Sequence, residues 1–122
     1  MAILRRRNAV MKGKSIRRGE IWWVSLDPAQ GSEIRKTRPC LVLTHDTLNE
    51  LRRTVVVVPL STAAQANPPI TIQMHCLGKE PVAVVDQIRA VAKHRLQSKL
   101  GQASTEDLGE IEDALKKVLE LR

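Results

Sequence analysis

The feature of this chain that most constrains its fold is a series of five short apolar runs, each bounded by residues that favour turns. Several runs are rich in β-branched residues, which favour the pleated, buried setting of a strand. The predicted strands cover residues 20–26, 40–44, 54–58, 70–74 and 82–88. Short strands separated by Pro and Gly turns are typical of a small barrel or sandwich with mostly antiparallel pairing.

The end of the chain has the pattern of an amphipathic helix that covers this barrel. Ser104 and Asp107 are spaced as in a capping box, with Asp in place of the usual Glu or Gln. One apolar stripe is formed by Leu108, Ile111, Leu115, Val118 and Leu119. The sequence therefore predicts a mainly β domain with a C-terminal helix, an α+β fold. A shorter helical turn is expected at residues 47–52.

The formal charge of +7 is distributed unevenly along the chain. Residues 1–18 contain seven basic residues and no acid, so the remaining 13 basic residues and all 13 acids balance in residues 19–122. We expect residues 1–16 to be a basic, disordered leader and residues 17–122 to be one folded domain. Two interpretations of the leader remain open, a segment without a role or an arm that binds nucleic-acid phosphates.

Length and composition exclude several classes of protein. A chain of 122 residues can bury one modest core but not two. It has neither the roughly 20 apolar residues of a membrane span nor the apolar centre of a signal peptide, so we expect a cytoplasmic protein without membrane contact. Cys40 and Cys76 lie in apolar sequence without metal-ligand spacing, and we expect buried thiols rather than a disulfide.

Common enzyme motifs do not occur in this sequence. It has no glycine-rich phosphate loop, no Cys-x-x-Cys pair and no His-Glu-x-x-His motif. His45, His75 and His94 are scattered without a local link to a nucleophile, and we interpret them as surface or strand-end residues. We therefore expect no metal site and no other cofactor.

Charged residues crowd the segment before the second predicted strand. Glu33, Arg35 and Lys36 precede Arg38, and Pro39 follows it. Proline donates no backbone hydrogen bond, is at home in a sheet as the first residue of a strand, and restricts the residue before it to extended geometry. We therefore expect Arg38 to lie on a rigid loop-to-strand junction, outside the apolar run.

Polar residues also follow two later strands. Ser61 and Thr62 come after the third run, which Pro59 is expected to end, and Asp86 and Gln87 end the apolar part of the fifth. Each residue alone is adequately explained as a strand-end group that satisfies a turn. Several of them together on a small barrel favour a groove that binds anions.

These residue types suit cleavage of RNA without a metal, because the ribose 2′-OH supplies the nucleophile. The protein then needs only to position the substrate, move protons and stabilise charge. The Arg38 guanidinium can meet two phosphate oxygens at once, and a hydroxyl can donate to a third. Trp22 and Trp23 should point to opposite faces of their strand, which leaves at most one of them to stack on a base.

Three blocks of the sequence resemble, in order, the signature blocks of the MazF/PemK-type toxin family. They are RRGEIWWVSLDPAQGSEIRKTRPCLVLT, VVVVPLST and VAVVDQI, and the resemblance spans residues 17 to 119. It implies an SH3-like barrel of about five to seven strands, a homodimer, and sequence-specific, metal-independent cleavage of single-stranded mRNA that inhibits translation and growth. It also implies a cognate antitoxin whose tail lies over the RNA groove, and a toxin–antitoxin complex that can bind promoter DNA.

Carried over residue by residue, the resemblance assigns catalysis to Arg38 and Ser61. The RNA-binding residues that it implies are Glu33, Lys36, Thr62, Asp86 and Gln87. Ser61 replaces the usual Thr, which keeps the hydroxyl but loses the methyl group that restrains its rotamer. Val84 stands where some members have an Arg, so a mechanism that uses that Arg as an acid is not open to this chain.

Two other functions remain open at the level of sequence. The same barrel occurs in toxins that inhibit DNA gyrase without being enzymes, and a relative could keep the fold and bind nucleic acid without cleaving it. The Arg–Pro pair together with a strand-end hydroxyl favours the nuclease.

Overall fold

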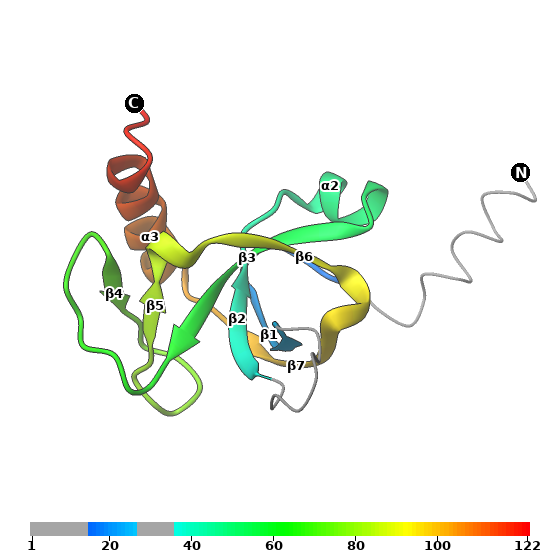
Figure 1. The fold of residues 1–122 in the computed structure, drawn as a ribbon, viewed down its shortest axis with the longest axis horizontal. Helices are drawn as coiled ribbons and strands as arrows, with labels where there is room; N and C mark the ends of the chain where they lie inside the picture. Colours follow the sequence, from blue (N-terminus) through cyan, green and yellow to red (C-terminus); the bar gives the residue numbers. More distant parts are fainter. Residues whose placement is uncertain (1–14, 27–35) are drawn as a thin grey trace, which may run out of the picture.

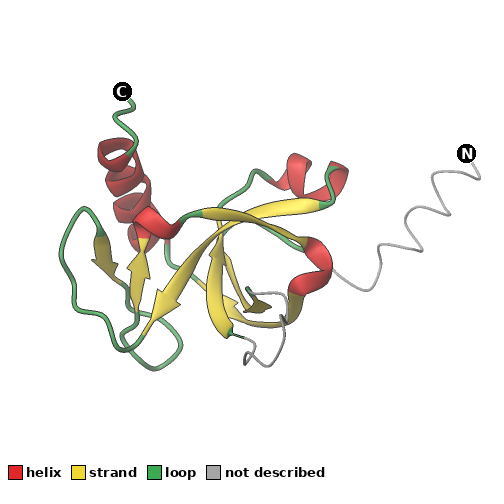
Figure 2. Cartoon of the chain, viewed as in Figure 1, coloured by secondary structure: helices red, strands yellow, loops and turns green. Residues whose placement is uncertain are grey.

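The computed structural model describes residues 15–26 and 36–122 of the chain. Seven antiparallel strands curl into a small barrel, and a C-terminal helix stands against one end of it (Figures 1 and 2). The strands are β1 (Glu20–Ser25), β2 (Thr37–Val42), β3 (Thr54–Ser61), β4 (Thr71–Gln73), β5 (Val82–Val84), β6 (Arg89–Ala92) and β7 (Leu96–Gln102). The helices are α2 (Asp46–Leu51) and α3 (Thr105–Val118), with single 3-10 turns at η1 (Val85–Gln87) and η2 (Lys93–Arg95). The predicted fold class is confirmed.

Strand β3 holds the sheet together because it pairs with three different strands along its length. Its first half, Thr54–Val57, lies beside β6, and residues 57–59 lie beside β2. Its last two residues, Leu60 and Ser61, pair instead with β5, which pairs in turn with β4. The main order is therefore β4-β5-β3-β2-β1-β7, and β3 passes from one half of the sheet to the other.

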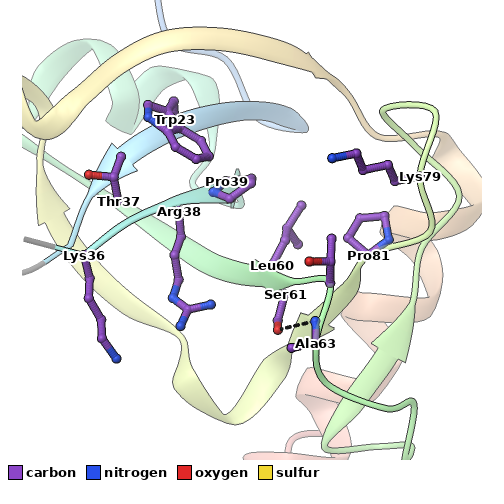
Figure 3. Close-up of a pocket in the computed structure, with 11 residues that line it drawn as sticks. Trp23, Lys36, Thr37, Arg38, Pro39, Leu60, Ser61, Ala63, Lys79 and Pro81 are labelled. Atoms are coloured by element: carbon purple, nitrogen blue, oxygen red, sulfur yellow. Dashed lines mark hydrogen bonds between the residues drawn. The ribbon is translucent and has the colours of Figure 1, made fainter.

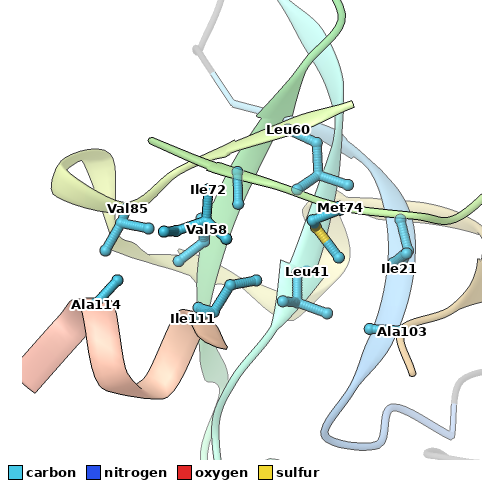
Figure 4. Packing of buried hydrophobic residues seen from close by; sticks show 11 residues of the cluster. Ile21, Leu41, Val58, Leu60, Ile72, Met74, Val85, Ala103, Ile111 and Ala114 are labelled. Carbon is cyan, nitrogen blue, oxygen red and sulfur yellow. The ribbon is translucent and has the colours of Figure 1, made fainter. Parts of the chain in front are cut away.

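The alternation of side chains along the strands fills two cores. In β3, Val58 and Leu60 enter one core, whereas Val55 and Val57 enter the other. The first core lies between the sheet and α3 and comprises Ile21, Leu41, Val58, Leu60, Ile72, Met74, Ala83, Val85, Ala103, Ile111 and Ala114 (Figure 4). The second fills the barrel with Ile16, Trp22, Val24, Leu26, Cys40, Val42, Val55, Val57, Val91 and Leu96. Ile16, at the end of the expected leader, is thus packed in a core.

Helix α3 begins as its sequence predicts. The Ser104 hydroxyl accepts a hydrogen bond from the Asp107 backbone N–H at 3.0 Å, which satisfies one free donor of the first turn. Ile111 and Ala114 are buried against the sheet. The predicted stripe is wrong at Leu119, which lies beyond the helix as its C-cap and is half exposed.

Pro39 and Pro59 both lie inside strands. The predictions that Pro39 begins a strand and that Pro59 ends one are therefore wrong. Pro39 is the third residue of β2, and Pro59 is the sixth residue of β3. Along an antiparallel strand, the backbone N–H groups of successive residues point alternately towards the two neighbouring strands. In β2 this alternation directs the Pro39 nitrogen towards β3, at the point where pairing between β2 and β3 has stopped. The Pro59 nitrogen faces the gap between the end of β6 and the start of β5. Neither missing N–H therefore removes a ladder bond.

The remaining differences concern weakly patterned segments. β6 and β7 were not predicted, because only Val91 in β6 and Leu96 in β7 are buried. The fifth predicted strand ends at Val84 and continues as η1. Both cysteines are free thiols, as expected, although Cys76 is only half-buried. Among the described residues, no helix is both long enough and apolar enough to cross a membrane.

Candidate active site

The divergence of β2 and β3 opens a groove at one edge of the barrel. The two strands pair as far as Cys40 and Pro59, and beyond this point β3 follows β5 while β2 stays with β1. The space between them is a cavity of about 430 Å³ (Figure 3). Eleven of the described residues line it: Trp23, Lys36, Thr37, Arg38, Pro39, Leu60, Ser61, Thr62, Ala63, Lys79 and Pro81.

Arg38 is held by a strand, not by a loop-to-strand junction as predicted. It is the second residue of β2 and pairs with Val24 of β1, so the sheet ladder fixes its backbone. Its side chain is half-buried and reaches into the groove (Figure 3). Within residues 15–26 and 36–122 its guanidinium has no hydrogen-bond or ion-pair partner, which leaves its donors available to an anion.

Ser61 ends β3 on the other side of the divergence. Its Oγ accepts hydrogen bonds from the backbone N–H groups of Ala63 at 3.1 Å and Ala64 at 3.2 Å. A serine oxygen has two acceptor sites and one proton to donate. Because both acceptor sites are occupied by backbone donors, the hydroxyl is set to donate its proton into the groove and is poorly suited to accept one.

The groove is positively charged. Lys36, Arg38 and Lys79 line it, and none of its described lining residues is an acid. Trp23 is half-buried and lies beside Pro39, whereas Trp22 is buried and its Nε1 donates to Glu20 at 2.9 Å (Figure 3). The prediction that one of the two tryptophans belongs to the core is therefore confirmed, and Trp23 is the one that remains to stack on a base.

The structure brings together four of the seven predicted site residues. Lys36, Arg38, Ser61 and Thr62 all line the groove. Asp86 and Gln87 lie exposed in η1 and are not among its lining residues. Glu33 lies outside the described residues, so its place relative to the groove stays a prediction.

Sequence reasoning missed Lys79. Its only local signal is Gly78, which marks a turn just before it. Nothing in the local pattern shows that this turn packs beside a groove formed by strands about 20 to 40 residues away in the chain.

The other reactive side chains considered in the described part of the chain, one cysteine and two histidines, are buried or take part in structural contacts. Burial raises the pKa of the Cys40 thiol to about 12, although the charges of Arg89 and Arg38 act in the opposite direction. The His45 Nδ1 accepts the Thr47 N–H at the start of α2, and His75 Nδ1 lies 3.4 Å from Asp107. Among the described residues, no group of three or more His, Cys, Asp or Glu is arranged to hold a metal ion.

The chain is similar to a known protein family and to a characterised relative. Residues 17–119 match the family described as PemK-like, MazF-like toxin of type II toxin–antitoxin system. Endoribonuclease MazF9 of Mycobacterium tuberculosis is 35% identical to the chain over 115 residues, covering 87% of this chain and 98% of the relative.

Solved structures share the fold. A MazE–MazF complex from Deinococcus radiodurans superposes with a TM-score of 0.77 at 22% identity, covering 89% of this chain and 100% of the other. A mycobacterial endoribonuclease in complex with its cognate antitoxin superposes with a TM-score of 0.73 at 23% identity, covering 88% of this chain and 97% of the other. The family match extends over almost the whole described domain and includes both walls of the groove. The chain therefore belongs to the PemK-like, MazF-like toxin family of type II toxin–antitoxin systems.

Proposed function

We propose that this chain is a toxin endoribonuclease that cleaves single-stranded RNA, within mRNA, at specific sequences and without a metal ion. The observation that carries the proposal is the meeting of Arg38 and Ser61 in one positively charged groove. The named relative MazF9, an endoribonuclease, supports the same reaction class. Gyrase inhibition, the alternative considered from the sequence, has no comparable support.

In this mechanism the 2′-oxygen of a ribose attacks the adjacent phosphorus. The 2′-OH gives up its proton as the new 2′-O–P bond forms, and the departing O5′ takes up a proton as the P–O5′ bond breaks. The products are a 2′,3′-cyclic phosphate and a 5′-hydroxyl. Negative charge grows on the non-bridging phosphate oxygens during the attack. Groups already aimed at these oxygens therefore lower the barrier, because they need not reorganise during the reaction.

Arg38 supplies the larger part of this stabilisation. A planar guanidinium matches two phosphate oxygens with parallel N–H donors and stays charged at every physiological pH. The ladder between β2 and β1 holds its backbone, and no partner among the described residues competes for its donors. The side chain can therefore meet the scissile phosphate without first breaking an internal contact.

Ser61 supplies a neutral donor on the opposite wall. The two N–H groups that donate to its Oγ polarise the hydroxyl and direct its proton away from the turn that follows β3. We assign to it a hydrogen bond to a non-bridging oxygen. Lys36 and Thr62 are then RNA-binding residues at the rim, and Glu33, Asp86 and Gln87 remain proposed RNA contacts.

The proposal includes the partners that the resemblance implies. The fold that the chain shares with toxins solved with their antitoxins supports a cognate antitoxin. A homodimer, promoter DNA binding by the toxin–antitoxin complex and a cytoplasmic location complete it. Residues 1–15 are proposed as the leader, and Ile16 joins the expected toxin domain of residues 17–122 because it is packed in a core.

The deciding experiment is cleavage of a long RNA by the purified chain in the presence of EDTA, with chemical mapping of the new ends. Cuts at a recurrent sequence that leave 2′,3′-cyclic phosphates are expected. An oligonucleotide with a single 2′-deoxy residue at the mapped site is the matched substrate, and it should resist cleavage. If it is cut as fast as the ribose form, the 2′-OH mechanism is wrong. A DNA gyrase supercoiling assay run in parallel should show no inhibition.

A further inference from the structure

One wall of the groove is formed by a strained hairpin turn. The segment between β4 and β5 turns at Cys76–Lys79, where the Lys79 N–H donates to the Cys76 carbonyl at 3.1 Å. Leu77 and Gly78 occupy the two central positions with φ values of 61° and 67°. Such a turn favours Gly, Asn or Asp at both positions, and a leucine there is strained. Strain of this kind persists only where the surroundings hold the residue in place.

Strand β7 holds Leu77. Gly101 lies so close to it that a Cβ there would come within 2.8 Å of the Leu77 Cδ2 atom. Leu77 and Leu100 also line a second cavity, of about 620 Å³, which shares Trp23 and Lys79 with the groove. At the base of the hairpin, the Gln73 side-chain amide donates to the Glu80 carbonyl at 2.8 Å. The turn is therefore fixed at its tip and at its base.

The consequence is the position of Lys79. It lines both cavities, and its ammonium group extends over the groove towards Pro39 (Figure 3). It is exposed and has no ion-pair partner among the described residues. Trp23 and Pro39 line both cavities together with Lys79 and present a largely apolar surface there. Two cations and an aromatic face in one groove suit a nucleotide whose base stacks while its flanking phosphates are bound.

We propose that Lys79 binds an RNA phosphate next to the scissile one, and that Leu77 positions it for this contact. The assignment rests on the proposed function, since Arg38 marks the scissile phosphate. A single-stranded RNA then spans the groove from Arg38 to Lys79, with Trp23 available to stack on a base. Lysine suits this role because it acts as a point charge for a phosphate that undergoes no chemistry.

The test compares Lys79→Ala with Lys117→Ala, which removes the same charge from an exposed position on α3. The probe is a fluorescent oligoribonucleotide that contains the mapped site with a 2′-deoxy residue, so that it binds without being cut. For Lys79→Ala we expect Kd to rise about threefold to tenfold and the slope of log Kd against log salt to fall by about 0.7, the contribution of one phosphate contact on a single strand. Lys117→Ala should match the wild type.

The positioning role of Leu77 is tested with Leu77→Gly and Leu77→Met. The glycine variant keeps the backbone conformation but loses the contact with β7. Its Kd should therefore rise by part of the increase expected for Lys79→Ala. The methionine variant keeps an apolar contact and should bind like the wild type. If Lys79→Ala and Lys117→Ala bind alike at every salt concentration, the assignment of Lys79 is wrong. If the wild-type chain cuts no long RNA, the proposed function fails and the assignment fails with it.

Discussion

Replacing Arg38 by lysine tests whether cleavage uses the two parallel N–H donors of the guanidinium, its fork, or only its positive charge. Lysine keeps the charge but offers one flexible point donor, which cannot make two parallel bonds to a phosphate. If the fork stabilises the transition state, its loss should cost on the order of 10²- to 10³-fold in rate, or about 2.7–4 kcal/mol, as for removal of a preorganised oxyanion donor. Arg38→Lys should therefore be almost as damaging as Arg38→Ala.

The structure predicts that neither variant is unstable. The Arg38 side chain is half-buried and has no hydrogen-bond or ion-pair partner in the described part of the chain, so its replacement leaves no buried group unpaired. A change in unfolding free energy within about 0.5 kcal/mol is expected for such a position. A fold defect therefore cannot explain a loss of 10²-fold or more in rate.

The assay is single-turnover cleavage of a fluorescent RNA, with circular dichroism melts as the folding control. Arg52→Lys is the matched control, because Arg52 is exposed at the end of α2 and does not line the groove. It should cleave like the wild type. Cleavage by Arg38→Lys within about threefold of the wild type would reduce the role of Arg38 to long-range attraction and refute the bidentate argument.

Four further outcomes are expected. Ser61→Ala should slow single-turnover cleavage by about 10²-fold because it removes a donor, whereas Ser61→Thr should remain active; equal rates for the two variants would contradict the donor role. Cleavage should survive EDTA, and activity that requires added magnesium would contradict the metal-free mechanism. Deletion of residues 1–14 should leave the melting temperature unchanged, because Ile16 stays in its core, and a shallower salt dependence of RNA binding would show that the leader contacts phosphates. Glu20→Gln should destabilise the protein at neutral pH, and the difference in stability from the wild type should shrink as the pH of a urea-unfolding series falls below 4.5.

The sign of the last prediction follows from the surroundings of Glu20. Burial alone would raise the pKa of this carboxyl, but hydrogen bonds from Trp22 and the Arg17 backbone, together with Lys99, hold it below its usual value of 4.5. A group whose pKa is lower in the folded state contributes stability above its unfolded pKa. This contribution is lost as the pH falls through the folded value, so the wild type loses its advantage over the glutamine variant in acid. A difference that stayed constant down to pH 2 would contradict this reasoning.

The sequence predicts best the elements whose apolar pattern is strong. The buried residues of β1 and β3 and the capped helix α3 lie where periodicity places them. Strands β6 and β7 escape prediction because most of their side chains are exposed, so the pairing with β3 and β1 defines them and not their own composition. Lys79 escapes for a related reason, since it lies on a hairpin between β4 and β5 that packs against β7 through Leu77 beside the groove. Long-range contacts of this kind leave no local signal.

Pro39 and Pro59 mark the place of the candidate site, although the strand boundaries predicted from them are wrong. Pro39 does not begin its strand and Pro59 does not end its strand, but the pairing between these two strands does end beside them. At Pro39 no N–H is available to extend the β2–β3 ladder, and beyond Pro59 the next two residues pair with β5 instead. The strands therefore continue while the distance between them grows, and the proposed catalytic residues lie past the last pair, Arg38 on β2 and Ser61 on β3. The groove exists because the backbone stays extended where its pairing stops, which holds both side chains on rigid walls.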